Sequence, residues 1–398
     1  MTAAAASPPL DPRPAGALPI GALTFLLSLG TGVLWNAIYF IAKSEYRFSE
    51  KENLLLAFAN GILYTLAALN AGRIVRALER VATPRTTLGM LLLGQGILAP
   101  LVLVPHRSAL WFAAVVMTAF GALQWPVVQH YLASGRHGRE MRNAIGWWNA
   151  SWMAATALSL ASMGPLESMS LARWAVPALL PINLLAMCCL YAFPAHPPEH
   201  HDLERARHVP SSYTALLGAA RILHPLGYLV IGALAPVLPY LFANLHTPES
   251  VQAPIGATWH LARFVAVLVL WRTAFWHGRA GTLVVAGLLL SLGFTLTIAA
   301  PSEKLLIAGL TAVGLGQGTI YYTAIYYGLA VGGAKVEAGG IHEALVGAGY
   351  FVGPALGLAA FSLDAGTPVF IGLVLGVLAA GFAASVLRAR RASSQSTA

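Results

Sequence analysis

The stretch FSEKENLLLAFANGILYTLAALNAGRIVRALERV, residues 48–81, decides the fold. Its central part, residues 53–72, has no charged side chain, whereas charged residues lie on both sides of it. A helix of about 20 apolar residues crosses the hydrocarbon core of a bilayer, which is roughly 30 Å thick. Because lipid offers no hydrogen-bond partner to the backbone, a segment at that depth must be helical. The stretch therefore predicts a transmembrane helix over residues 53–76.

Eleven further stretches are similarly long and apolar, and the gaps between them hold most of the charged residues. Charged residues make up only 10% of the chain, against about 25% in soluble proteins. The sequence therefore predicts an all-α membrane protein, with the lipid bilayer as its surroundings and no large soluble domain. The twelve predicted spans are residues 16–43, 53–76, 87–104, 108–134, 144–164, 169–193, 213–243, 253–276, 280–299, 303–333, 341–363 and 366–388.

The formal net charge of +9 reflects the orientation of these spans rather than a nucleic-acid partner. Of the 24 lysines and arginines, sixteen lie on the side of the two termini and six on the opposite side. Positive charge marks the cytoplasmic side of a membrane protein. We therefore expect a multi-pass protein of the cell membrane (plasma or inner) with both termini in the cytoplasm. The two remaining arginines, Arg221 and Arg263, fall inside predicted spans.

The longest interior polar segment, PAHPPEHHDLERARHVPSS at residues 194–212, follows six spans and precedes six more. Because transporter folds commonly contain internal repeats, the equal span counts predict two pseudo-symmetric six-helix bundles. The histidines and acids of this segment could hold a metal, but its prolines favour a flexible solvated loop, so we expect no metal and no cofactor. The predicted parts are a disordered cytoplasmic tail (1–15), an N-terminal bundle (16–193), a cytoplasmic linker (194–212), a C-terminal bundle (213–388) and a cytoplasmic tail (389–398).

Residues 48–81 and the twelve-span pattern resemble the major facilitator superfamily. In that family the turn after the second helix reads approximately Gly-x-x-x-Asp-x-x-Gly followed by basic residues. This chain has Gly72 and Arg73 at the start of that turn, but Arg76 stands at the acidic position and Glu79 at the second glycine. The resemblance implies a transporter with two bundles that move against each other, and the departure at Arg76 puts the family's usual charge contact at the cytoplasmic gate in doubt.

Ionisable groups at membrane depth are costly and commonly functional. Arg263 lies midway along a predicted span, and His260, three residues before it, shares its helix face. Ligand sites combine mostly apolar walls with a few placed polar groups, and such groups recur near the middle of several spans. The candidate substrate-binding residues are Arg263, His260, Gln124, Gln317, Asn36, Tyr39, Tyr228, Tyr321 and Tyr322.

No acidic residue lies near the centre of a predicted span. Coupling to protons would then need histidine, whose pKa lies near neutrality. The candidate coupling residues are His130, His224 and His260, while facilitated diffusion or another coupling ion stays an equal alternative. The nearest acid, Glu343, is expected to pair with an arginine such as Arg221 or Arg142.

Candidate gating residues lie in the motif turn and in the span over residues 341–363. In that span, Gly353 and Pro354 belong to a run of small residues that lets another backbone approach closely. Tight helix packing is the favoured interpretation of this run, and a role in the movement between bundles is the alternative. The gating candidates are Gly72, Arg73, Arg76, Arg221, Glu343, Gly353 and Pro354.

These features predict a secondary active or facilitative transporter that moves a small organic solute by alternating access, as a monomer. Arg263 favours an anionic solute, with a proton or another ion as a possible second partner. A transporter-like sensor or assembly protein stays an alternative. A membrane-embedded enzyme is less favoured, because no carboxylate lies at mid-depth to assist the histidines.

Overall fold

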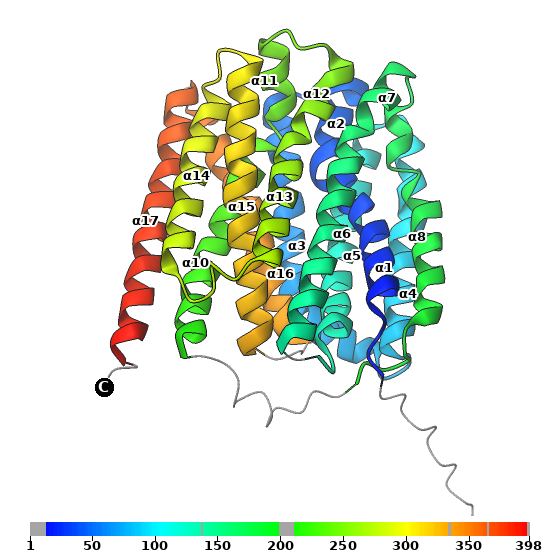
Figure 1. Ribbon diagram of the computed structural model, residues 1–398. Helices are drawn as coiled ribbons and strands as arrows, with labels where there is room; N and C mark the ends of the chain where they lie inside the picture. The colour runs from blue at the N-terminus through cyan, green and yellow to red at the C-terminus, as the bar shows by residue number, and fades with distance from the viewer. Residues whose placement is uncertain (1–12, 137, 199–210, 333–335, 364–365, 396–398) are drawn as a thin grey trace, which may run out of the picture.

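The computed structural model describes residues 13–136, 138–198, 211–332, 336–363 and 366–395 as long helices that run side by side from one end of the molecule to the other (Figure 1). The first half of the chain forms α1 (Ala17–Gly32), α2 (Ile38–Tyr46), α3 (Glu50–Leu78), α4 (Pro84–Leu98), α5 (Arg107–Ala133), α6 (Gly138–Ala161), α7 (Met163–Ser168) and α8 (Leu179–Cys189). The second half forms α10 (Ser211–Leu234), α11 (Leu238–Asn244), α12 (Glu249–Gly256), α13 (Thr258–Arg272), α14 (Ala280–Ile298), α15 (Glu303–Gly332), α16 (Val336–Ser362) and α17 (Gly366–Gln395).

Several of these helices join into single spans. A π-helical segment, Val33–Ala37, connects α1 to α2, and α12 leads directly into α13. Eleven spans in the described part of the chain are long and apolar enough to cross a membrane, counted by length and composition. The twelfth, α6, begins with Arg139, Glu140 and Arg142 and is rich in tryptophan, serine and asparagine. It packs against α1 on one side and α13 on the other, so protein rather than lipid surrounds much of it.

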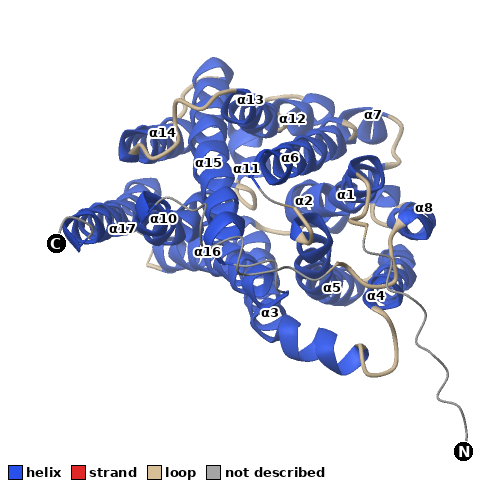
Figure 2. Ribbon diagram, turned by 60° about the horizontal axis from the view of Figure 1, so that its bottom comes forward, coloured by secondary structure: helices blue, strands red, loops and turns tan. Residues whose placement is uncertain are grey.

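The helices form two groups that meet along a seam, as Figure 2 shows. The first group holds the helices before residue 199 and the second those after residue 210. Across the seam, α3 packs against α16 and α6 against α13. The prediction of an all-α protein with two six-helix bundles is confirmed. Residues 199–210 of the predicted linker and residues 1–12 of the predicted N-terminal tail lie outside the described residues. Helix α17 continues to Gln395, past the predicted end of the last span.

Several predicted spans differ from the observed helices in their bounds, and two of them end well before the predicted residue. The span predicted at 213–243 stops at Leu234 because Pro236 and Pro239 interrupt the backbone ladder there. The span predicted at 253–276 is shifted towards the N-terminus and occupies 249–272. It ends where the Trp276 indole donates to the carbonyl of Leu270, at 2.7 Å, which satisfies one of the last helical carbonyls.

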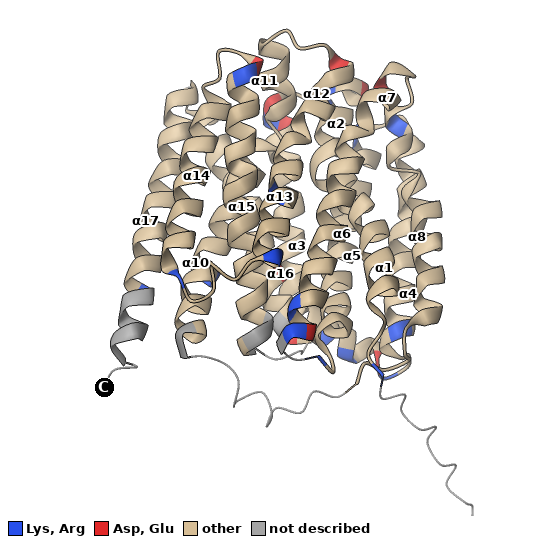
Figure 3. Ribbon diagram, in the orientation of Figure 1, with Lys and Arg blue, Asp and Glu red and all other residues tan. Residues whose placement is uncertain are grey.

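Charged residues gather at the two ends of the bundle, and the middle is almost free of them (Figure 3). At the end that bears the termini, Arg76 of α3 forms an ion pair with Glu337 of α16, and Gly72 packs against the same carboxylate side chain. Arg76, which stands where the family has an acid, thus has an acidic partner across the seam. The contact has the reverse polarity of the family pattern, and it joins the two halves.

The opposite end is closed by side chains that donate to backbone carbonyls of the other half. The Lys43 ammonium lies 2.9 Å from the carbonyl of Pro239, and the Tyr240 hydroxyl 2.6 Å from that of Phe48. The buried Asn53 amide reaches the carbonyl of Pro236 at 3.3 Å. Contacts therefore join the two halves at both ends of the seam.

Glycines allow the close approach of α3 and α16. A Cβ on Gly61 would lie 2.5 Å from the backbone nitrogen of Phe351, a distance that real side chains do not adopt. We predict that Gly61→Val lowers the stability of the closed protein by about 1–3 kcal/mol, the usual cost of overpacking. Thermal unfolding in detergent measures the loss. Gly372→Val is the matched control, because a Cβ there meets nothing within 4 Å; equal melting of the two variants would contradict the prediction.

Glu167 in α7 lies between two spans at the closed opposite end. Burial, together with the nearby Glu249 carboxylate, raises the pKa of Glu167 to about 7, although the Lys43 ammonium opposes the shift. A raised pKa means that the folded protein disfavours the ionised form, so stability falls as pH rises from the ordinary value near 4.5 towards 7.

We predict that Glu167→Gln removes this loss and raises the melting temperature at pH 8, but leaves it nearly unchanged at pH 4.5. Melting curves across this pH range test it. Glu140→Gln, a change at an exposed carboxyl of the other end of the bundle, is the control. A gain of equal size at both pH values would contradict the assignment to Glu167.

Candidate functional site

An aromatic cavity lies at the seam, about midway between the two ends. In this closed arrangement its free volume is small, about 30 Å³. Its walls come from both halves: Trp35, Tyr64, Trp125, Trp148 and Trp152 on one side, and Tyr228, Tyr321, Glu343 and Tyr350 on the other, with Thr31 and Val346. The Trp35 and Tyr350 rings stack with their centroids 4.0 Å apart, which is a direct contact between the halves. The π-helical turn that carries Trp35 and Asn36 faces this region, and such turns are frequent at functional sites.

Glu343 is the one carboxylate among the residues that line this cavity. It accepts a hydrogen bond from the Tyr64 hydroxyl and another from the Gln129 amide, each at 2.5 Å. Both donors belong to the first half of the chain, whereas Glu343 belongs to the second. The expected pairing of Glu343 with Arg221 or Arg142 is therefore wrong. Its helix, α16, begins at Val336 and not near 341, so the side chain sits deeper than the sequence indicated.

Arg263 of α13 lies behind the aromatic wall. Its side chain is 1% exposed, and the guanidinium carbon is 3.9 Å from the centre of the Trp152 ring and 4.7 Å from that of Tyr321. One guanidinium nitrogen donates to the Tyr228 hydroxyl at 2.9 Å. The three ion pairs found among the described residues do not include Arg263. The sequence predicts Arg263 as a substrate-binding residue; in this arrangement aromatic faces, which attract a cation, lie between it and the cavity.

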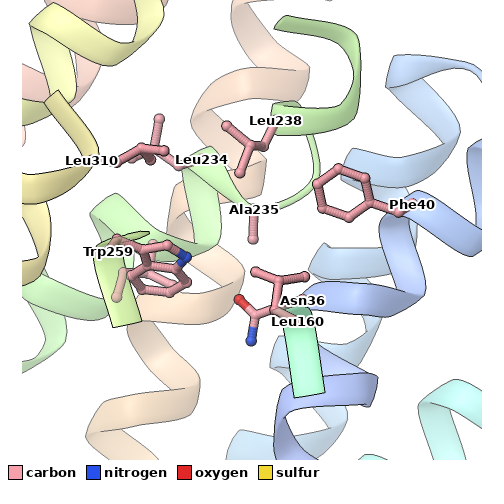
Figure 4. Close-up of a pocket in the computed structure, with 9 residues that line it drawn as sticks. Asn36, Phe40, Leu160, Leu234, Ala235, Leu238, Trp259 and Leu310 are labelled. Carbon is pink, nitrogen blue, oxygen red and sulfur yellow. The ribbon is translucent and has the colours of Figure 1, made fainter. Parts of the chain in front are cut away.

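Two further hollows lie on the seam, one on each side of the aromatic cavity. The hollow towards the opposite end, about 10 Å³, is mostly apolar. Figure 4 shows the Asn36 amide and the Trp259 indole facing its interior from the two halves. The other hollow lies towards the termini and includes Arg221, His224 and His342. The three hollows together follow the seam from one end to the other.

The remaining candidate residues do not line the aromatic cavity. Gln124 bonds the Leu91 carbonyl and the Gln95 amide, inside the first half. Tyr322 packs against Trp276 in an aromatic cluster near the termini. His260 packs against the ring of Trp259, next to the opposite-end hollow. The structure places Tyr39, Gln317 and His130 outside the residues that line the three hollows: Tyr39 and Gln317 are buried, and His130 lies near Ser134.

The glycines of α16 hold it against α10 within the second half. A Cβ on Gly353 would meet the backbone of Leu229 and Ala233, and one on Gly232 of α10 would lie 2.9 Å from the backbone of Tyr350. This geometry supports tight packing around Gly353 and Pro354, the interpretation that the sequence favoured. The gating candidates that bridge the halves are Gly72, Arg76 and Glu343.

The sequence did not single out Tyr64, Trp152, His342 or Tyr350. A helical-spacing rule could have found two of them. Trp152 is four residues from Trp148, and Tyr350 is seven from Glu343, so each pair shares a helix face. His342 precedes Glu343 and lies beside His224, with ring centroids 4.3 Å apart. Tyr64 gives no comparable signal, because nothing in the sequence says which half it contacts.

Comparisons with known proteins agree with this architecture. A family model described as Major Facilitator Superfamily matches residues 20–227, which is more than half of the chain. The solved structure of the human organic anion transporter MFSD10 (TETRAN) aligns with a TM-score of 0.65 at 15% sequence identity, over 94% of this chain and 99% of that one. At this identity the likeness shows the fold alone. The comparison with curated proteins gives no match.

The Tyr64–Glu343 hydrogen bond joins the halves at the cavity, and a hydrogen bond to a charged group contributes about 1.5–3 kcal/mol. We predict that Tyr64→Phe lowers the stability of the protein by that amount, measured by thermal unfolding in detergent. The loss should shrink in a Glu343→Gln background, where the charge is gone. Tyr191→Phe is the control, since Tyr191 is 90% exposed. A loss at Tyr64 no larger than the control would mean that the bond does not hold the halves together.

Proposed function

Because this chain belongs to the major facilitator superfamily, we propose that it is a secondary transporter that moves a small organic anion across a membrane by alternating access. Its fold is that of a multi-pass membrane protein of a transporter family, which favours transport over catalysis within the membrane. In the proposed arrangement both termini lie in the cytoplasm and the protein resides in the cell membrane. The distribution of lysine and arginine supports that orientation.

The surroundings of Arg263 are the main reason for proposing an anionic solute. Its guanidinium is buried at mid-depth, and no ion pair joins it to a carboxylate in the part of the chain that the structure describes. A buried charge without a counter-charge is costly in a membrane. By contrast, both oxygens of Glu343 already accept hydrogen bonds from Tyr64 and Gln129. A bound anion would therefore supply the missing partner of Arg263.

The cavity walls suggest how the rest of the solute is held. Trp152 and Tyr321 stack with an interplanar angle of 8° and cover the guanidinium of Arg263. A modest turn of either ring would admit a carboxylate to Arg263, while the solute's own apolar part would pack against the other tryptophans and tyrosines. An aromatic carboxylate satisfies both requirements, because aromatic rings stack favourably on one another.

An organic cation is a second candidate, favoured by one observation. The charge that lines the cavity itself is Glu343, and eight aromatic side chains surround the same space. Aromatic faces and a carboxylate together recognise amines and quaternary ammonium groups. The two candidates make opposite demands: an anion needs Arg263, whereas a cation needs Glu343. Coupling of transport to protons through His130, His224 or His260 stays a prediction.

Uptake into liposomes that contain the purified protein tests the proposal. We predict that a panel of radiolabelled aromatic carboxylates includes a transported solute. Arg263→Gln should reduce its uptake about tenfold or more, since a charge-assisted hydrogen bond is lost, whereas Arg263→Lys should retain part of it. Arg279→Gln, a change at an exposed arginine on α14, is the matched control.

Three outcomes would contradict the proposal. Uptake of amines that is lost in Glu343→Gln but kept in Arg263→Gln would identify a cation transporter. Binding of the solute without accumulation inside the liposomes would identify a sensor. Equal uptake by Arg263→Gln and Arg279→Gln would remove Arg263 from the site.

A further inference from the structure

The hollow towards the termini is here called the vestibule. The polar side chains described in its lining are either positively charged or neutral. Its free volume is about 30 Å³, and the polar side chains that line it are Gln129, Arg221, His224 and His342. Among the described residues, no aspartate or glutamate lines it. Arg221 is exposed and Ile341 is 51% exposed, so the vestibule reaches the protein surface. The vestibule is thus a surface hollow whose ionisable groups are all cationic or neutral.

Three imidazole nitrogens at this space lack hydrogen-bond partners among the described residues. The His224 side chain is 1% exposed, and neither ring nitrogen has a hydrogen-bond partner among the described residues. The same holds for Nε2 of His342. Buried polar atoms are normally paired, so an unpaired pair of imidazoles calls for an explanation. Arg221 likewise makes no ion pair within the described ranges, although its charge lies near His342.

We propose that Arg221, His224 and His342 form a second oxyanion subsite, distinct from the aromatic cavity. The Arg221 guanidinium presents a planar set of donors that matches a carboxylate or a phosphate. Each imidazole supplies at least one N–H donor even when neutral. The group bound is a carboxylate or phosphate of a soluble organic anion, with the guanidinium at the mouth of the vestibule and the imidazoles deeper inside.

The subsite stands in series with Arg263. Arg221 and Tyr228 are seven residues apart on α10, which is about 10 Å along a helix, and the Tyr228 hydroxyl bonds Arg263. His224 lies between them, and its ring centroid is 5.2 Å from that of Tyr228 and 5.6 Å from that of Tyr321. An anion in the vestibule is therefore separated from the cavity by this layer of rings. Its role as a stage on the transport path rests on the proposed function; binding at the vestibule does not.

Histidine resonances give a local readout of the vestibule. The full chain, labelled with ¹³C at histidine and held in nanodiscs of neutral lipid, is titrated with benzoate and with inorganic phosphate at constant ionic strength. His224→Gln and His342→Gln assign the two resonances. We expect both resonances to shift to saturation with at least one of the two anions. Arg221→Gln should weaken this binding about tenfold or more, Arg221→Lys should weaken it less, and the control Arg279→Gln should leave it unchanged.

The proposal is overturned if neither anion shifts the two resonances, or if Arg221→Gln and Arg279→Gln bind alike. It is also overturned if nanodiscs of anionic lipid shift the same resonances and abolish the response to benzoate and phosphate, because the occupant is then a lipid headgroup. The Arg263→Gln variant separates this proposal from the function. Its vestibule should still respond to the anion, and normal uptake by that variant would contradict the function proposed for Arg263 while leaving the subsite in place.

Discussion

A bilayer interior offers no hydrogen-bond partner, and this constraint determines where every polar side chain of the protein lies. Arg263 and Glu343 are both nearly inaccessible, and each is surrounded by groups from neighbouring helices. The seam between the halves is the place where such groups can meet without contacting lipid. It therefore gathers the charged and aromatic residues, while the outward faces of helices such as α14 and α17 are almost wholly apolar.

The same constraint concentrates at the seam both the polar groups that would contact a solute and the hydrogen bonds that hold the two halves together. Tyr64 and Gln129 hold Glu343 across the halves, and Asn53 reaches the Pro236 carbonyl. Each of these bonds must break when the halves separate, and each group then needs water or a solute in exchange. Breaking a buried bond costs more than the bond contributes when intact, because the abandoned group is left unsatisfied. A solute or water that enters the seam would offset that cost, which links occupancy of the cavity to its opening.

Much of the fold could be predicted from the sequence, because hydrophobic length is a property of each segment alone. The apolar length of residues 53–76 predicts a transmembrane span whatever helices pack around it, and the same holds for ten of the other spans. Even α6, whose tryptophans and asparagines make it less apolar, could be recognised from its place between two charged gaps. The ends of the helices were harder to predict, because the break at Pro236 and the early start of α16 at Val336 depend on local backbone contacts.

The site could be predicted only in part, because it depends on which residues of distant helices face each other. The depth of Arg263 in the membrane could be predicted from the sequence. Its contacts with Trp152 and Tyr321 could not, because these residues are more than 50 positions away along the chain. Glu343 was misjudged for the same reason: its partners, Tyr64 and Gln129, come from two helices of the other half.

The contacts at the two ends of the seam differ in kind. In the proposed alternating-access cycle, this difference favours separation of the halves first at the end near the termini. The opposite end is held by Lys43, Asn53 and Tyr240, which donate to carbonyls exposed by the breaks around Pro236, Pro239 and Phe48. The end near the termini is held by Arg76 and Glu337, whose side chains are 58% and 48% exposed. Exposed ion pairs contribute little because water competes for both charges. The vestibule lies on the same side as this weaker contact, and the rings of His224, Tyr321 and His342 lie between it and the aromatic cavity.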